Sequence, residues 1–249
     1  MSIPLVIIGH GKMGRLVGQL APDHGFSVCA HFSSANIFTL SKESLHGASV
    51  ATEFTTPATA PGNLRRAAAF GLNIVSGTTG WYEQLPEIRQ AVAVAGTALV
   101  YGPNFSIGVN LFFETVVHAA ALFAQHPEYE GWGGEIHHSA KKDVPSGTLK
   151  KLAEEIRAAG FHRPLTLSAN RAGAHTGTHE IGFDSPADTI TLRHTARSRE
   201  GYARGALQAA RWIAGKHGVF EFREILGELS AANGSGSVDQ SAVRHSAGG

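Results

Sequence analysis

The stretch VIIGHGKMGRL, residues 6–16, decides the fold of the amino-terminal part of this chain. An apolar run ending at Ile8 is typical of a buried strand, and a helical pattern follows it. Between them, Gly9, Gly11 and Gly14 have G-x-G-x-x-G spacing. In this context the first glycine permits a tight turn, the second lets the backbone approach a pyrophosphate, and the third lets helix and strand pack closely. The stretch therefore predicts a Rossmann-like unit that binds a dinucleotide where its first helix begins.

Short apolar runs alternate with helical patterns beyond this stretch. Strands are expected at FSVCAHF (26–32), ASVATEFT (48–55), LNIVSGTTG (72–80) and TALVYG (97–102), and a helix at LRRAAAFG (64–71). Strands and helices alternating at this spacing form βαβ units with a parallel sheet. We therefore expect residues 1–103 to form an α/β dinucleotide-binding domain.

The pattern changes after a long apolar helical stretch at 107–125. Strand-like runs, a helix at GTLKKLAEEIRAAG (147–160) and a hairpin at HEIGFDSPADTITLRHTA (179–196) follow, then an amphipathic helix. This mixture predicts a second, α+β domain over residues 104–216. GVFEFREIL is expected to return to the first domain, within about 217–230, and the Ala-, Ser- and Gly-rich tail 231–249 is expected to be disordered.

Composition excludes several classes of function. The net charge is +1 and 43% of residues are hydrophobic, which is typical of a soluble globular protein and argues against binding to nucleic acid or a membrane surface. No apolar run approaches the roughly 20 residues that span a bilayer. The only cysteine, Cys29, cannot form an internal disulfide, and the amino terminus lacks the features of a signal peptide. We expect a cytoplasmic protein.

The end of the second predicted strand bears on which dinucleotide binds. The acidic residue that holds the ribose of NAD is expected about 20 residues after the glycine turn. That region contains His31, Ser33 and Ser34 and no carboxylate, so a 2′-phosphate would be tolerated. No arginine stands there to bind the phosphate. The sequence therefore favours NADPH, or the use of both NADPH and NADH.

The segment EIHHSAKKDVPSGT, residues 135–148, places an unusual number of ionisable groups before a helix. Ser146 is a good N-cap, and the free N–H groups of the first turn favour an anion. Helix capping alone would explain Ser146 but not the histidine and lysine pairs. An imidazole at His137 suits proton transfer near neutral pH, and a cation at Lys141 stabilises developing negative charge. Lys142 is interpreted as a solvated charge.

Two features of this sequence leave alternatives open. His137 and His138 point to opposite faces if the strand continues, so both reach one substrate only if it ends there. The loop SGTTG (76–80) is either a binding loop for a flat polar group, such as a carboxamide, or an ordinary βα connection. No metal site is expected, because His175 and His179 are separated by a segment that does not look helical and no cysteine cluster is present.

Seven segments in this order resemble one known family. They are GHGKMG (9–14), EFTTP (53–57), SGTTG (76–80), GPNFSIGVN (102–110), EIHHSAKKDVPSGT (135–148), RAGAHTGTHEIGF (171–183) and HTARSREGYARGAL (194–207). Together they closely resemble the 4-hydroxy-tetrahydrodipicolinate reductases (dihydrodipicolinate reductases) of lysine and diaminopimelate synthesis. The resemblance spans roughly residues 3–227. It implies a homotetrameric, NAD(P)H-dependent reductase that converts this dicarboxylate to tetrahydrodipicolinate, with the second domain binding substrate and building the tetramer.

The resemblance also implies roles for individual residues. His137 takes the place of the catalytic acid/base and Lys141 that of the catalytic lysine. The positions that match substrate contacts are His138, Ser146, Gly147 and Thr148. The positions that match or flank the cofactor site are Gly9, His10, Gly11, Lys12, Met13, Gly14, His31, Ser33, Thr55, Gly77, Thr78, Thr79, Pro103, Asn104, Phe105 and Arg199.

The chain departs from the family pattern at three places. Glu53 stands where the family usually has Asp, Gly102 where it often has Ala, and the glycine turn is one residue shorter than the commoner form. These departures bear on cofactor preference rather than on the reaction class. The alternatives are another Rossmann-fold imine or aldehyde reductase and a non-catalytic dinucleotide-binding protein, which intact His137 and Lys141 argue against.

Overall fold

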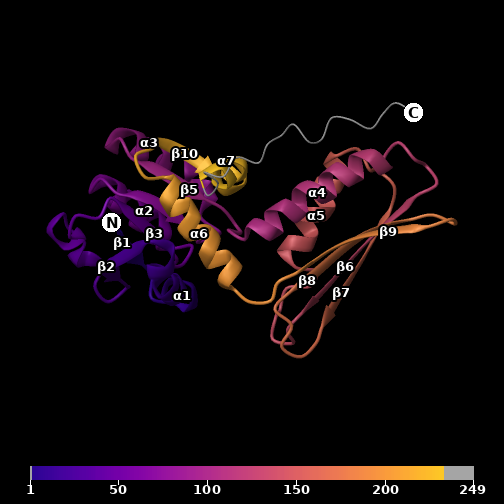
Figure 1. The fold of residues 1–249 in the computed structure, drawn as a ribbon, viewed down its shortest axis with the longest axis horizontal. Helices are drawn as coiled ribbons and strands as arrows, with labels where there is room; N and C mark the ends of the chain where they lie inside the picture. The colour runs from indigo at the N-terminus through magenta and orange to yellow at the C-terminus, as the bar shows by residue number, and fades with distance from the viewer. Residues whose placement is uncertain (1, 233–249) are drawn as a thin grey trace, which may run out of the picture.

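In the computed structural model, which describes residues 2–232, two β-sheets lie at opposite ends of the molecule (Figure 1). The first sheet has the strand order β10-β5-β4-β3-β1-β2, with every pair parallel. Its elements are β1 (Ile3–Ile8), α1 (Lys12–Leu20), β2 (Phe26–Phe32), β3 (Val50–Glu53), α2 (Ala60–Ala69), β4 (Asn73–Ser76), α3 (Leu85–Ala95), β5 (Ala98–Tyr101) and β10 (Gly218–Glu221). The predicted α/β class and parallel sheet are confirmed.

The order of the strands creates a switch point between β1 and β3. The chain leaves β1 for β2 on one side and then crosses to β3 on the other. At this point Ile8, Glu53 and Ser76 are in register on adjacent strands, at the carboxyl edge of the sheet. Ligands of open α/β sheets bind at this edge, in the crevice at the switch point.

Two local features of the first sheet differ from the sequence-based expectation. The residues KMGRLVGQLAPDHG (12–25) have the pattern of one helix with Gly25 as its stop, but α1 ends at Leu20 and a 3₁₀ turn follows over Pro22–His24. Proline has no N–H to continue an α-helix, which explains the early end. The helix α3 was not among the predicted elements, although Pro86 in its first turn and the left-handed Gly96 after its last turn are typical boundary signals.

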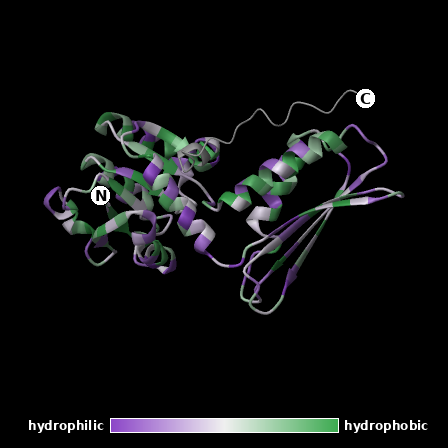
Figure 2. Cartoon of the chain, in the orientation of Figure 1, coloured by the Kyte–Doolittle hydropathy of each residue, from purple (hydrophilic) through white to green (hydrophobic). Residues whose placement is uncertain are grey.

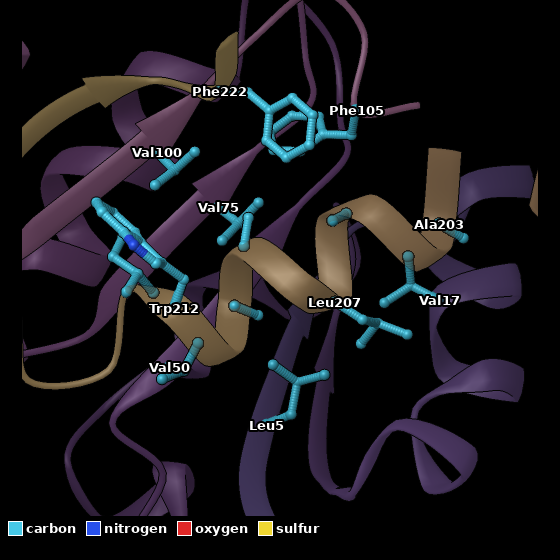
Figure 3. Close-up of a cluster of buried hydrophobic side chains, with 14 of the residues drawn as sticks. Leu5, Val17, Val50, Val75, Val100, Phe105, Ala203, Leu207, Trp212 and Phe222 are labelled. Atoms are coloured by element: carbon cyan, nitrogen blue, oxygen red, sulfur yellow. The ribbon is translucent and has the colours of Figure 1, made fainter. Parts of the chain in front are cut away.

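Helices cover both faces of the first sheet. One face packs against α1 and α6 (Glu200–Trp212), and the other packs against α2 and α3. Figure 3 shows Leu207 and Trp212 of α6 directed at the strands, in a cluster with Leu5, Val50 and Val75. Each fully buried apolar side chain of this size contributes about 1.5–3 kcal/mol.

The position of α6 corrects the expected domain boundaries. The sequence placed residues 104–216 in the second domain, but α6 packs on the first sheet because its alanine-rich face is buried there. The contact is close: a Cβ at Gly205 would lie 1.8 Å from the carbonyl oxygen of Phe105. After α6 the chain forms β10, which pairs with β5 in the first sheet.

The second sheet has the order β7-β6-β8-β9 and is mixed, with β6 parallel to β7 and antiparallel to β8. Its elements are α4 (Ile107–Phe123), β6 (Glu130–His137), α5 (Gly147–Ala158), β7 (Leu165–Arg171), β8 (Thr178–Asp184) and β9 (Thr189–Thr195). Helices α4 and α5 lie on one face, over a core that includes Phe113, Leu152 and Phe183. Figure 2 shows that α4 is largely hydrophobic, whereas the strands mix both kinds of residue.

Two findings concern the ends of the chain and membranes. The helix α7 (Leu226–Ala232) includes the first two residues of the tail expected to be disordered, and residues 233–249 lie outside the described part. Within residues 2–232, no helix has the length and apolar character needed to cross a membrane.

Candidate functional site

The glycine turn after β1 has the geometry expected of a dinucleotide site. Gly9 has φ +112°, and a Cβ there would lie 2.1 Å from the carbonyl oxygen of Phe54. A Cβ at Gly14 would lie 1.9 Å from the carbonyl oxygen of Gly9, so helix and turn pack without room for a side chain. A Cβ at Gly11, in contrast, would meet no atom of residues 2–232 within 4 Å. The turn therefore offers an exposed backbone at the start of α1, which suits a pyrophosphate.

A cavity of about 540 Å³ lies beside this turn. It brings together predicted cofactor residues from three strand ends: Gly9, His10, Gly11, Ser33 and Thr55. The neighbouring residues of the turn do not line it. Lys12 is exposed at the start of α1, and Met13 packs against the core of the first sheet.

His31 also lies outside this cavity. Its ring meets that of His10 edge-on, with centroids 5.8 Å apart, and packs beside Gly18 of α1. Burial, and then the neighbouring His10, lower the pKa of His31 below its ordinary value. Asn36 caps the turn that follows β2: its Oδ1 accepts a hydrogen bond from the backbone N–H of Ser33 at 2.7 Å. No carboxylate occupies residues 31–36.

Glu53 is a buried carboxyl at the switch point that the sequence noted only as a departure. Its oxygens accept from the hydroxyl of Ser76 at 2.6 Å and the hydroxyl of Thr78 at 3.1 Å. They also accept from the backbone N–H of Thr55 at 3.1 Å and from its hydroxyl. Burial raises the pKa of Glu53, against the effect of these hydrogen bonds. Glu53 therefore joins the two loops, EFTTP and SGTTG, that the sequence assigned to the cofactor.

The rings of Tyr202 and Phe54 pack against the SGTTG loop at Gly77. The Tyr202 hydroxyl donates to the carbonyl of Gly77 at 3.1 Å. A Cβ at Gly77 would lie 2.2 Å from the ring of Phe54 and 2.6 Å from the Tyr202 oxygen, so only glycine fits. Thr78 is buried against Glu53, while Thr79 is exposed.

A second cavity, of about 430 Å³, lies between the two sheets. It brings predicted cofactor residues Thr79, Pro103 and Asn104 together with predicted substrate residues Gly147 and Thr148. The cavity is therefore where the carboxyl edge of the first sheet meets the start of α5.

Several of the predicted site residues line neither cavity: Lys12, Met13, Gly14, His31, Gly77, Thr78, Phe105 and Arg199 of the cofactor set, and His137, His138, Lys141 and Ser146 of the catalytic and substrate set. The side chain of Phe105 is fully buried, with its ring 4.5 Å from that of Phe222. Phe105 thus supports the loop after β5 from inside. Arg199 is exposed at the N-cap of α6, where the chain returns to the first sheet.

Ser146 caps α5 as its residue type predicts. Its backbone is extended, with φ −64° and ψ 158°, and its hydroxyl accepts from the N–H of Leu149 at 3.2 Å. The backbone N–H groups of Gly147 and Thr148 lie in the same first turn, before that of Leu149. Asp143 lies near the same end: a hydrogen bond from Lys141 is the main cause of its lowered pKa, and the Gly147 N–H also contributes.

The two adjacent histidines lie at the end of a strand. Strand β6 ends at His137, and the chain turns, with the N–H of Lys141 donating to the carbonyl of His138 at 3.0 Å. His138 lies beyond the end of the strand, so the alternation of side chains along a strand does not place it on the face opposite His137. The ammonium of Lys141 pairs with Asp143 at 2.7 Å, and Lys142 is exposed.

A cluster around Glu135 lies beside these residues. The Glu135 side chain is fully buried, and its Oε1 accepts from the Ser146 N–H at 2.8 Å and from Arg171 Nη2 at 2.9 Å. Its Oε2 accepts from the Ser146 hydroxyl and lies 3.4 Å from Nε2 of His179 and 3.6 Å from Nδ1 of His137.

Sequence reasoning gave no site role to Glu135, Arg171 or His179. One signal was present: Glu135 and His137 are two residues apart on a strand, so both face the same side. Nothing local places Arg171 or His179 next to them, because β7 and β8 reach β6 only through sheet pairing.

Burial and neighbouring cations set the charge state of this cluster. Burial by itself would raise the pKa of Glu135, but hydrogen bonds from Ser146 and Arg171 lower it below its usual value. Burial lowers the pKa of His137, opposed by Glu135 and reinforced by Lys141 and Arg171. Burial, and then His137, lower the pKa of His179 to about 4, so His179 is neutral near pH 7.

By distance alone, Glu135, His137 and His179 could hold a metal ion, since their ligand atoms lie within 4.8 Å of one another. Both oxygens of Glu135 already accept hydrogen bonds, and the Arg171 guanidinium beside them repels a cation. These hydrogen bonds and the neighbouring positive charge make the cluster better suited to hydrogen bonding than to holding a metal ion.

Comparison with known proteins covers nearly the whole chain. Family models described as dihydrodipicolinate reductase, N-terminus and C-terminus, match residues 3–105 and 108–226. A 4-hydroxy-tetrahydrodipicolinate reductase of Christiangramia forsetii is 29% identical over 242 residues, 90% of this chain and 98% of the relative. A reductase of the same name from Thiobacillus denitrificans is 31% identical over 268 residues, 91% of this chain and 99% of the relative.

Solved structures support the fold. The dihydrodipicolinate reductase of Paenisporosarcina sp. TG-14, with dipicolinate bound, superposes with a TM-score of 0.70 at 21% identity, over 90% of this chain and all of that one. GenD2 from gentamicin A biosynthesis, in complex with NAD, has a TM-score of 0.58 at 12% identity, over 92% of this chain and 93% of that one. Both are likenesses of fold.

Proposed function

Because the chain belongs to the dihydrodipicolinate reductase family, we propose that it reduces its substrate in the cavity between the two sheets, with His137 and Lys141 carrying the chemistry. The reaction class follows from membership of the family: it is an NAD(P)H-dependent reduction of 4-hydroxy-tetrahydrodipicolinate in lysine biosynthesis. The observation that supports the location is the 430 Å³ cavity, whose lining includes Thr79 and Asn104 from one side and Thr148 from the other.

The first sheet holds the dinucleotide, which supplies the hydride when it is bound. The exposed backbone at Gly11 and the N-terminus of α1 suit its pyrophosphate. The SGTTG loop, supported by Tyr202 and Glu53, presents Thr79 toward the second cavity, where the nicotinamide end would be held.

NADPH is the proposed preference of this enzyme. The argument is the end of β2, where Ser33 lines the cavity and no carboxylate opposes a 2′-phosphate. His10 lines the same cavity and offers a nitrogen to a phosphate oxygen. Steady-state kinetics with NADH and NADPH side by side test this: a kcat/KM for NADH above that for NADPH would contradict it.

The start of α5 and Lys141 are proposed to hold the substrate's carboxylates. The N–H groups of Gly147 and Thr148 suit one carboxylate, with the helix dipole behind them. Lys141 is paired with Asp143, so a carboxylate of the substrate would share or replace that partner. His138 directly follows β6 and is proposed as a further contact of the substrate's carboxylates. Dipicolinate, the planar dicarboxylate bound by the Paenisporosarcina enzyme, is the matching ligand for a binding test.

His137 is the proposed proton donor. Reduction of a C=N or conjugated system by hydride leaves negative charge that must be protonated or stabilised. Burial lowers the pKa of His137, which is only 7% exposed, and the negative charge of Glu135 partly opposes this by favouring the protonated ring. Lys141 adds electrostatic stabilisation from the adjacent turn.

A homotetramer in the cytoplasm is the proposed working state. Among the described elements, α4 and α5 cover only one face of the second sheet (Figure 1). The other face carries Trp132, whose ring lies over Gly182, and Ile136, and both side chains are half-buried. A partly apolar sheet face of this kind is suited to pairing with another copy of the chain. Light scattering at micromolar concentration would test the proposal.

The test of function is an assay of NADPH oxidation with the coupled aldol product of pyruvate and aspartate semialdehyde. We expect turnover with the wild type and a loss on the order of a hundredfold or more in kcat for Lys141→Ala. Lys142→Ala, an exposed neighbour, is the matched control and should behave as the wild type. Normal turnover by Lys141→Ala would overturn the assigned role. Absence of turnover by the wild type, with NADPH binding intact, would overturn the reaction.

A further inference from the structure

Glu135, in the cluster beside the proposed active site, is a counter-charge for His137, and its other contacts give it a second role. Glu135 faces inward on β6 with a fully buried side chain. A buried carboxylate is costly unless donors satisfy it, and here the donors are Ser146 at the start of α5 and Arg171 of β7. Glu135 therefore connects separate parts of the fold, and the residues that it contacts indicate its role.

The first link is to the start of α5. Glu135 accepts the backbone N–H of Ser146 at 2.8 Å and also the Ser146 hydroxyl. The same hydroxyl accepts the N–H of Leu149 at 3.2 Å. Glu135 thus fixes the position and direction of the helix start, and with them the backbone N–H groups of Gly147 and Thr148.

The second link is to His137. Its Nδ1 is buried without a hydrogen-bond partner among the described residues, and it lies 3.6 Å from Oε2 of Glu135. A small movement of the ring completes a charge-assisted hydrogen bond. A proton on Nδ1 leaves Nε2 as the titrating atom, and Nε2 points toward Gly177, where a Cβ would lie 3.1 Å away.

We propose that Glu135 is a positioning residue for the reduction: it holds the proton donor His137 in one tautomer and the start of α5 in one place. One carboxylate then sets the distance between the group that delivers a proton and the groups that hold a carboxylate of the substrate. The proposal rests on the proposed function of His137 and α5. Misplacement of either group by a fraction of an ångström slows a reaction that depends on orientation.

Several charged or titratable groups face this cluster and enter any dependence on pH. They are Arg171 from β7, His179 from β8, His194 from β9 beyond His179, Lys141 and Asp143 from the turn before α5, and His137 itself. Arg171 is the only one within hydrogen-bond distance of Glu135 that carries a permanent charge, at 2.9 Å. Removing the carboxylate would leave this cation facing His137 and disfavour its protonated form.

Two substitutions separate the effect of the negative charge of Glu135 on His137 from the effect of its hydrogen bonds to Ser146. Glu135→Gln removes the charge at similar size. We expect kcat to fall on the order of tenfold or more, and the fall of activity on the alkaline side to move to lower pH, because His137 loses its counter-charge. Glu135→Asp keeps the charge but withdraws from Ser146; we expect the alkaline limb to stay in place while the KM for substrate and the Kd for dipicolinate rise about tenfold. Glu130→Gln, on the exposed end of the same strand, is the matched control.

A measurement on the unmodified enzyme covers the case in which a variant fails to fold. Nitrogen-15 NMR of histidine-labelled protein reports which ring nitrogen of His137 carries the proton, and we expect Nδ1. A folded Glu135→Gln with wild-type kcat, KM and pH profile would overturn the proposal, as would a proton on Nε2 of neutral His137. If the wild type binds dipicolinate but does not turn over, the proposed function fails, while the tautomer and the dipicolinate affinities still decide the role of Glu135.

Discussion

Acid stability of the enzyme depends on His179, and the size of the effect can be worked out. Burial lowers the pKa of His179 to about 4 in the folded protein, from an ordinary value of 6.5. As the pH falls through this window, the unfolded chain takes up a proton that the folded protein does not. The stability that a neutral His179 contributes is therefore complete above pH 6.5 and is lost between pH 6.5 and pH 4. The linkage relation gives a loss of about 2 kcal/mol at pH 5.

Substitution by glutamine isolates this contribution. The amide nitrogen of His179→Gln can reach the position of Nε2, beside Ser146 and Glu135, without titrating. Urea denaturation at pH 8 and pH 5 gives the free energy of unfolding of both proteins, at one protein concentration because an oligomer's stability depends on it. We expect the wild type to lose about 2 kcal/mol more than the variant between these pH values.

Other histidines do not obscure the comparison. His137 and His194 also have a lowered pKa from burial, but they are present in both proteins, so their contribution largely cancels in the difference. At pH 8 His179 is neutral in either state, and the remaining difference between the proteins reflects packing alone. Equal losses of stability between pH 8 and pH 5 in both proteins would refute the reasoning.

Three further substitutions test the fold and the cofactor site. Gly205→Ala places a Cβ 1.8 Å from the Phe105 carbonyl oxygen, so α6 must move, and urea denaturation should show a loss of about 3 kcal/mol or more. Gly9→Ala places one 2.1 Å from the Phe54 carbonyl oxygen, in a turn with φ +112°, and should raise the KM for NADPH at least about tenfold while leaving dipicolinate affinity unchanged in calorimetry. Arg223→Met removes the hydrogen bonds from Nη1 to both oxygens of Glu155 in α5 and the ion pair with Glu114 in α4. Thermal unfolding should report a loss of about 1–2 kcal/mol, partly restored by Arg223→Lys.

Much of the local geometry of the candidate site was predictable because short segments of the sequence specify it. The spacing of Gly9, Gly11 and Gly14 after an apolar run specifies the turn through steric fit alone. Ser146 before a helical pattern specifies an N-cap. His137 and Lys141 stand four residues apart in a segment whose polar content exceeds the needs of capping. Each inference used interactions within about ten residues, the range over which backbone conformation is set locally.

The supporting residues could not be found in the same way. The partners of Glu135 are 11, 36 and 44 positions away, at Ser146, Arg171 and His179, and sheet pairing alone brings them together. Glu53 looked like a conservative replacement, yet it joins two loops that lie 23 to 25 positions apart.

The sequence by itself determined the parallel sheet, the glycine turn and the capped start of α5, because periodicity and local sterics select these features whatever surrounds them. Tertiary structure decided that α6 belongs to the first sheet. Its alanine-rich face would fit any apolar surface, and only the close approach of Gly205 to Phe105 singles out one. It also decided that β6 ends at His137 and that a buried carboxylate lies beneath it, since burial and pairing depend on which strands become neighbours.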